Sequence, residues 1–194
     1  MSARSVLSFV ALAALALPAF AHPGHLGDTG SLLAGLSHPL SGPDHLLAMI
    51  SIGLWAACLG GRAVWMVPAA FLLGTAAGFG LALAGIGLPL VEPGIAASVI
   101  ALGALIAFAV HLPLAASMLL AGLFAVFHGQ AHGAELVGAA WSFGTGFIVT
   151  TALLHLAGIA VVRVGTGPRR GLLMRSLGGV VTISGMALLA GVWA

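Results

Sequence analysis

The stretch from Ile95 to Phe127, IAASVIALGALIAFAVHLPLAASMLLAGLFAVF, decides how the chain is folded. It contains no Asp, Glu, Lys or Arg, and as one helix it would extend about 50 Å at 1.5 Å per residue. The hydrocarbon core of a bilayer is about 30 Å thick, so the stretch is too long for one crossing. His111-Leu112-Pro113 is the expected turn, because proline suits the first turn of a following helix. The stretch therefore predicts two membrane helices.

The composition of the whole chain agrees with this reading. Of 194 residues, 61% are hydrophobic and only 5% are charged, against about 25% in soluble domains. This excludes a soluble domain, and a net charge of +2 is too small to attract nucleic acid. The 29 glycines suit close helix contacts in lipid, as in Gly74-x-x-x-Gly78 and the neighbouring Gly80. We expect an all-α polytopic membrane protein whose surroundings are the lipid bilayer.

Residues 1–21 have the pattern of a cleaved signal peptide. Arg4 precedes an apolar core, and Ala19-Phe20-Ala21 is a small-x-small cleavage site. The alternative is an uncleaved first helix. Residues 22–194 are then expected to form one membrane domain of six transmembrane helices. The apolar runs that predict these helices are 31–59, 63–84, 94–111, 113–129, 135–162 and 171–193.

The charged residues give this domain an orientation. If the mature amino end lies outside, six crossings place Arg62 and the arginines of 163–175 on the inner side. All four acidic residues then fall on the outer side, and the arginines obey the positive-inside rule. Five crossings would instead place a loop with four arginines outside. Six helices with both termini on the outer, periplasmic side are therefore favoured.

Two histidines and an aspartate lie within His38-Pro39-Leu40-Ser41-Gly42-Pro43-Asp44-His45. The intervening prolines and glycine are expected to break the first apolar run, with a helix that starts at Asp44. The bend could return His38 toward the other two residues. Irregular backbone at membrane depth occurs only where it is buried in protein or lines a watery cavity. We interpret His38, Asp44 and His45 as metal ligands; the alternative is a capping Asp44 with interfacial histidines.

A second polar group occurs in Phe127-His128-Gly129-Gln130-Ala131-His132-Gly133-Ala134-Glu135. On a helix, His128, His132 and Glu135 share one face at i, i+4 and i+7. Imidazole and carboxylate ligands without thiolate suit Ni²⁺, Co²⁺, Zn²⁺ or Cu²⁺. Gly129 and Gly133 weaken a helix, however, so the segment is also compatible with a loop on the outer side.

The other polar side chains are few. Glu92 falls on the same outer side as the two motifs and is a further metal-ligand candidate. His155 lies in the inner half of the fifth helix, and His111 lies at the inner end of the third. They could form a weak, neutral exit relay, because conduction needs sites that release the ion. The alternative is that each makes a hydrogen bond between helices. Cys58 is expected to serve packing only.

At its two motifs the sequence resembles the HupE/UreJ family of nickel permeases, which are accessory to hydrogenase and urease, and the resemblance covers essentially the whole chain. It implies a six-helix protein of the bacterial inner membrane. Such a protein carries Ni²⁺ inward by facilitated diffusion, although some members prefer Co²⁺. The metal is then substrate rather than permanent cofactor, and the partners are indirectly the maturation proteins of hydrogenase or urease. The resemblance assigns metal handling to His38, Asp44, His45, His128, His132, Glu135 and Glu92, and metal capture to His22 and His25.

Two other functions stay open on the residues alone. A bis-His haem b cytochrome would need apposed histidines near mid-membrane, whereas these histidines accompany carboxylates near one surface. An intramembrane zinc-dependent hydrolase could use His128, His132 and Glu135, but no His-Glu-x-x-His pattern is present. The chain has no lysine and hence no Walker A motif, so it is not itself an ATPase. We expect a transporter and not an enzyme.

The six-helix topology can be tested at the carboxyl end. Six crossings from an outside amino end predict that the chain ends in the periplasm. A reporter fused after Ala194 should be active if it works only in the periplasm and silent if it works only in the cytoplasm. The reverse pattern would contradict the topology.

Overall fold

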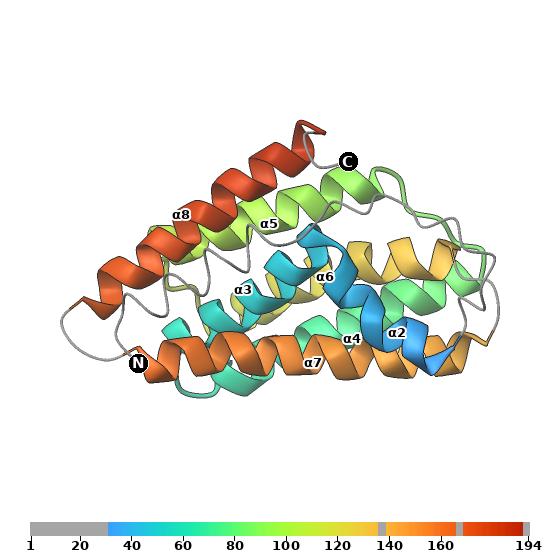
Figure 1. Cartoon of the computed structure of the whole chain (residues 1–194), viewed down its shortest axis with the longest axis horizontal. Coiled ribbons are helices and arrows are strands. Elements are labelled where there is room, and N and C mark those ends of the chain that lie inside the picture. The colour runs from blue at the N-terminus through green and yellow to red at the C-terminus, as the bar shows by residue number, and fades with distance from the viewer. Residues whose placement is uncertain (1–30, 136–138, 166–168, 192–194) are drawn as a thin grey trace.

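The structure is a computed structural model that describes residues 31–135, 139–165 and 169–191. These residues form seven α-helices and no strand, which confirms the predicted all-α class (Figure 1). The expected signal peptide 1–21 and the histidines at 22 and 25 lie outside the described residues. In chain order the helices are α2 (Leu32–Ser41), α3 (Pro43–Leu59), α4 (Ala63–Leu83), α5 (Val91–Ala107), α6 (Leu114–Glu135), α7 (Ala140–Val164) and α8 (Arg170–Leu189).

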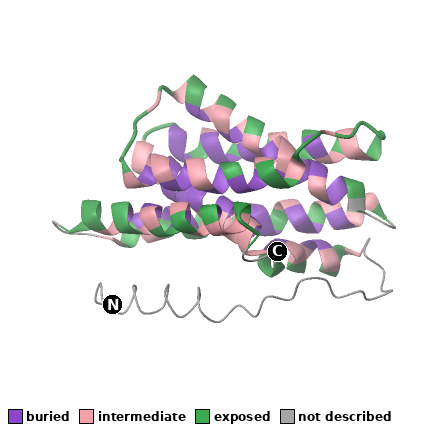
Figure 2. Ribbon diagram, turned by 90° about the horizontal axis from the view of Figure 1, so that it is seen from above, coloured by how far each residue is buried: buried purple, intermediate pink, exposed green. Residues whose placement is uncertain are grey.

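The helices have the length and surface of membrane spans. Among the described residues, α4, α6, α7 and α8 are each long and apolar enough to cross a bilayer, and the bent pair of α2 and α3 adds a fifth if it is one span. Helix α5 is apolar but has 17 residues, about 26 Å at 1.5 Å per residue. Large side chains such as Leu73 and Ile183 are 72% and 64% exposed on the outside of the bundle, as lipid-facing residues are (Figure 2). The chain is a helical membrane protein.

The apolar stretch 95–127 forms parts of two helices, as its length predicts. Helix α5 ends at Ala107 and α6 begins at Leu114. His111 lies in the connection between them, and its Nδ1 is 2.9 Å from the carbonyl oxygen of Ala109. The prediction of two helices separated at His111-Leu112-Pro113 is confirmed.

Helices α2 and α3 meet at an angle of 84°. Pro43 occupies the first turn of α3 and has no N–H to continue the ladder of α2. A residue before proline is pushed out of the helical region, and Gly42 is extended, with φ −101° and ψ 126°. The break predicted from the sequence is confirmed, with α3 starting at Pro43, one residue before the predicted start.

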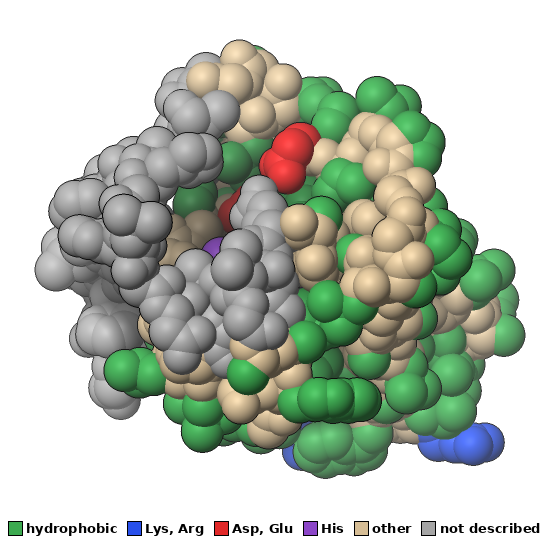
Figure 3. Space-filling view, turned by 90° about the vertical axis from the view of Figure 1, so that its right-hand side faces the viewer, with side chains coloured by type: hydrophobic (Ala, Val, Ile, Leu, Met, Phe, Trp, Pro, Cys, Tyr) green, Lys and Arg blue, Asp and Glu red, His purple; other side chains and the backbone are tan. Residues whose placement is uncertain are grey.

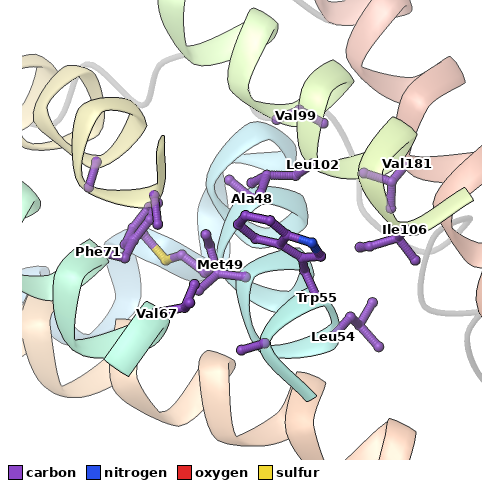
Figure 4. Close-up of a cluster of buried hydrophobic side chains, with 14 of the residues drawn as sticks. Ala48, Met49, Leu54, Trp55, Val67, Phe71, Val99, Leu102, Ile106 and Val181 are labelled. Carbon is purple, nitrogen blue, oxygen red and sulfur yellow. The ribbon is translucent and has the colours of Figure 1, made fainter. Parts of the chain in front are cut away.

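Helix α3 is the centre of the bundle. It contacts α2, α4, α5, α7 and α8, and the side chains of Met49, Ile52 and Trp55 are at most 1% exposed. They meet Phe71 of α4 and Leu102 of α5 in one cluster (Figure 4). In lipid the association of helices depends on such packing more than on the hydrophobic effect. The central position of α3 brings the residues at its start close to several other helices.

Glycines let neighbouring helices touch through their backbones. A Cβ at Gly74 would lie 2.9 Å from the Cβ of Ala125 on α6, and one at Gly78 would lie 3.0 Å from the backbone nitrogen of Gln130. These two glycines therefore serve the helix contact predicted from their spacing. Gly80, included in that prediction, has no neighbour within 4 Å. It is turned away from α6, so the prediction is wrong for this residue.

Adjacent glycines of α8 offer a test of this packing. A Cβ at Gly178 would lie 2.7 Å from the carbonyl oxygen of Gly103 on α5, whereas a Cβ at Gly179 would meet nothing within 4 Å. Gly178→Ala should therefore destabilise the protein by about 1–3 kcal/mol, as overpacking does. The matched Gly179→Ala should be neutral or slightly stabilising. Thermal unfolding of the two variants in detergent measures the difference, and equal midpoints would contradict the close contact.

Candidate metal centre

The second histidine motif is helical throughout. Helix α6 continues to Glu135, because Gly129 and Gly133 face α4 and are needed there. A Cβ at Gly129 would lie 2.7 Å from the backbone nitrogen of Phe79, and one at Gly133 would lie 2.6 Å from the Cβ of Ala82. Contact with α4 thus outweighs the weak helix propensity of glycine. The alternative of a loop is wrong, and the predicted helix face that carries His128 and His132 is confirmed.

Helix α2 is held in place by α7. A Cβ at Gly35 would lie 3.0 Å from the Cα of Phe143, and one at Gly146 would lie 2.7 Å from the backbone nitrogen of Leu36. The hydroxyl of Thr150 also donates to the carbonyl of Leu36 at 2.8 Å. Helix α2 therefore lies against α7 and carries its histidine, His38, into the bundle.

Four histidines from three helices converge at one place. The ring of His132 on α6 lies 4.4 Å from the rings of both His38 on α2 and His45 on α3, between centroids. The ring of His128, one turn earlier on α6, lies 4.9 Å from that of His45. We call His38, His45, His128 and His132 the histidine cluster. His45, His128 and His132 are buried and His38 is half-buried, so the cluster lies mostly inside the protein.

Asp44 orients His45. Its Oδ1 lies 2.9 Å from Nδ1 of His45 and also accepts the backbone N–H of His45 at 2.8 Å. The Nδ1–H of His45 therefore donates to the carboxylate, so the lone pair of His45 is on Nε2. This Nε2 lies 2.5 Å from Nε2 of His132. Carboxylates that hold histidines in this way are typical partners of metal-binding imidazoles.

Ser98 of α5 fixes the tautomer of His128. Its hydroxyl donates to the carbonyl of Ile95 at 2.7 Å, so the same oxygen can only accept from Nε2 of His128, 2.9 Å away. The lone pair of His128 is then on Nδ1. This atom is buried and has no hydrogen-bond partner. A ligand nitrogen is thus available inside the protein, and the sequence did not point to Ser98.

Aromatic rings close the sides of the cluster. The ring of Phe147 lies 4.5 Å from that of His132, and Phe143 lies 5.6 Å from His38. Phe71 of α4 lies 5.6 Å from His128. These rings pack against the imidazoles, and Phe147 and His132 also line a mostly apolar cavity of about 390 Å³. No motif in the sequence singles out these phenylalanines, although Phe143 and Phe147 share one helical face at i and i+4.

The two acidic candidates described by the structure meet at a cavity. Asp44 and Glu92 both line a space of about 290 Å³ beside the starts of α3 and α5. Figure 3 shows an acidic side chain on this end of the molecule and a histidine recessed in a hollow beside it. Glu135 is the last residue of α6, and its side chain lies outside the described part of the chain. Asp44 links this cavity to the cluster through its contact with His45.

The remaining candidates lie apart from the cluster. His155 is buried on α7, where its ring lies 5.3 Å from that of Phe71. His111 is exposed and lines a different cavity with Arg170 and Arg175. No hydrogen bond or ring contact in the described residues joins His111 to His155, so the structure does not pair them. Cys58 is half-buried against the hydrophobic core, as expected.

The imidazoles of the histidine cluster contact one another directly. Among the described residues, no three His, Cys, Asp or Glu side chains have their donor atoms arranged to hold a metal. The physical reason lies in the contact between the two Nε2 atoms, since His45 and His132 now satisfy each other. An ion would have to separate them.

Comparison with known proteins adds an independent finding. Residues 10–188 match the family described as HupE / UreJ protein. The chain is 45% identical over 183 residues to Protein HupE of Rhizobium leguminosarum bv. viciae, and the aligned part covers 93% of this chain and 95% of that protein. No solved structure matches the chain significantly.

The approach of Gly42 to Asp44 generates a prediction about the cluster. A Cβ at position 42 would lie 2.5 Å from Oδ1 of Asp44 and 3.3 Å from Nδ1 of His45. Gly42→Ala should therefore displace the carboxylate and weaken metal binding about 10–100-fold, the usual effect of losing such a partner. Asp44→Asn should act in the same direction. Calorimetric titration of the purified protein with Ni²⁺ measures both, with Leu33→Ala as control, since Leu33 is exposed on α2. Unchanged affinity in Gly42→Ala would show that Asp44 does not support His45.

Proposed function

The chain belongs to the HupE/UreJ family of hydrogenase and urease accessory proteins, and we propose that it carries Ni²⁺ across the bacterial inner membrane into the cytoplasm. The family consists of permease-type proteins with a nickel-related role and not of enzymes. The observation that carries the proposal is the histidine cluster, in which imidazoles from α2, α3 and α6 meet inside a membrane bundle. Ionisable groups at such depth are costly and mark ion pathways.

The ligand chemistry supports a transition-metal ion as cargo. Neutral imidazole binds nickel, copper, zinc and iron, whereas magnesium and calcium prefer oxygen ligands. Entry of the ion would replace the contact between Nε2 of His45 and Nε2 of His132. The lone pair on Nε2 of His45 would turn to the metal, and His132 would have to give up the Nε2 proton that it donates in that contact before it could bind through the same atom. Ni²⁺ is the proposed substrate because of the family, and Co²⁺ has similar ligand preferences. No permanent cofactor is part of the proposal.

The charges supply an orientation. The turn between α3 and α4 carries Arg62, and α7 ends and α8 begins at the same end of the bundle, with Arg163 and Arg170 (Figure 1). The cavity lined by Asp44 and Glu92 lies beside the starts of α3 and α5. Under the positive-inside rule the arginine end is cytoplasmic. Six crossings then result if α2 and α3 form one broken span and α5 crosses as well, and both termini are periplasmic.

In this arrangement the ion moves from the periplasm to the cytoplasm. The capture segment with His22 and His25 and the carboxylates Glu92 and Glu135 would first concentrate it. The histidine cluster would then replace part of its hydration shell. Transport follows the concentration gradient, which maturation of hydrogenase or urease would maintain by consuming the metal inside.

The geometry of the histidine cluster fits neither a bis-His haem protein nor a zinc hydrolase. A bis-His haem needs a gap between two imidazoles that admits the macrocycle, but the Nε2 atoms of His45 and His132 lie 2.5 Å apart. A zinc hydrolase would need a reachable polar substrate site at the cluster. Here Phe143 and Phe147 cover its imidazoles instead, and the family is not one of enzymes.

Transport and the cluster can be tested together. His45→Ala and His132→Ala should each abolish Ni²⁺ uptake into proteoliposomes, because each removes a nitrogen ligand from the centre of the cluster. His111→Ala is the matched control, since this histidine is exposed and outside the cluster, and it should transport normally. Uptake of Co²⁺, Zn²⁺ and Cu²⁺ by the unmodified protein ranks the metals. Normal uptake by the two cluster variants would contradict the proposed site, and no uptake by the unmodified protein would contradict the function.

A further inference from the structure

One buried histidine outside the cluster has no hydrogen-bond partner. His155 on α7 is 2% exposed, and neither Nδ1 nor Nε2 contacts a donor or an acceptor. A buried polar group left unpaired costs about 1–3 kcal/mol. A histidine that only joined two helices would be expected to use at least one nitrogen for that purpose. The lack of a partner therefore calls for a function.

The surroundings of His155 link it to the histidine cluster. The ring of Phe71 contacts both histidines, with its centroid 5.6 Å from that of His128 and 5.3 Å from that of His155. His128 in turn keeps Nδ1 buried and unpaired. One aromatic ring thus lies against two imidazoles that both have free nitrogens, one in the cluster and one on α7.

Two other buried hydroxyl groups without hydrogen-bond partners occur on α7 and α3. Thr151 precedes His155 by one turn of α7 and so lies on the same face, and its hydroxyl is buried and unpaired, as is that of Ser51 on α3. The backbones of α3 and α7 touch here, because a Cβ at Gly158 would lie 2.8 Å from the backbone nitrogen of Leu54. On α7 an unpaired hydroxyl and an unpaired imidazole therefore lie on the same helix face, next to the contact with α3.

We propose that His155 forms a second, inner metal site, at which the ion is held briefly after it leaves the histidine cluster past Phe71. The proposal rests on the transport function proposed above. It assigns imidazole nitrogen from His155 as the principal ligand, with the hydroxyl of Thr151, one turn earlier on the same face, as the second candidate ligand.

The inner site would bind more weakly than the outer one. The four acidic residues of the chain are Asp28, Asp44, Glu92 and Glu135, and none lies on α7. The outer cluster has several imidazoles and the carboxylate of Asp44, whereas His155 is one imidazole with neutral neighbours. Conduction requires a site from which the ion can leave. A single neutral ligand between the cluster and the arginine end meets this requirement.

Rate and binding distinguish an inner site from the outer one. His155→Ala should lower the initial rate of Ni²⁺ uptake about tenfold, which corresponds to about 1.4 kcal/mol in the barrier, without changing the affinity measured by calorimetry. His45→Ala should lose both uptake and binding. Unchanged uptake in His155→Ala would overturn the proposal, and so would an equal loss of affinity, which would place His155 in the outer site. A protein without uptake even when unmodified would refute the transport function instead.

A cysteine at position 155 gives a direct readout that does not depend on transport rates. The chain has one cysteine, so a Cys58→Ala background carries no other thiol. In that background His155→Cys should show a thiolate-to-metal charge-transfer band when loaded with Co²⁺, because thiolate is a strong ligand for this ion. Val99→Cys is the control, since Val99 is fully buried on α5 and faces α8, and it should show no band. Absence of the band at position 155 would overturn the inner site, including in the case that His155→Ala does not fold.

Discussion

The position of His45 between Asp44 and His132 is the interaction on which the site depends. The carboxylate fixes the proton of His45 on Nδ1, and this directs Nε2 toward α6. In a membrane no water is available to satisfy a misplaced imidazole. Asp44 must therefore stay in contact with His45. Gly42, just before Pro43 at the break, leaves room for the carboxylate because it has no Cβ. The same Gly42-Pro43 step thus breaks the first span and positions Asp44 beside His45.

Glycine contacts bring the ligand helices close enough for this interaction. His45 and His132 are separated by 87 residues in sequence, and they meet because α6 lies against α4 through Gly129 and Gly133 while α3 also contacts α4. His38 joins them because α2 lies against α7 through Gly35 and Gly146. Larger residues at these positions would move the helices apart by more than a hydrogen bond tolerates. The high glycine content is therefore a condition for the metal centre as well as for packing.

The tautomers give the cluster its chemical character. Ser98 holds the proton of His128 on Nε2, and Asp44 holds that of His45 on Nδ1. Both histidines then present a lone pair inside the bundle, from different ring atoms. His155 has no such partner on either nitrogen. Among the buried histidines that the structure describes, those of the cluster are hydrogen-bonded and His155 is not, and Phe71 lies between His128 and His155. An ion that passed from the cluster to His155 would therefore move from firmer to looser ligation.

The sequence by itself determined the membrane class, the division of Ile95–Phe127 and the break before Pro43, because apolar length and proline geometry act locally along the chain. It also selected the histidines of the cluster, since rare polar residues stand out in so apolar a chain. The tertiary structure alone decided which glycines face a neighbouring helix: Gly133 does and Gly80 does not. It also decided that Ser98 and Phe147 contact the histidine cluster. These features depend on which faces of distant helices meet. That choice is made by packing over the whole bundle, which no local spacing encodes.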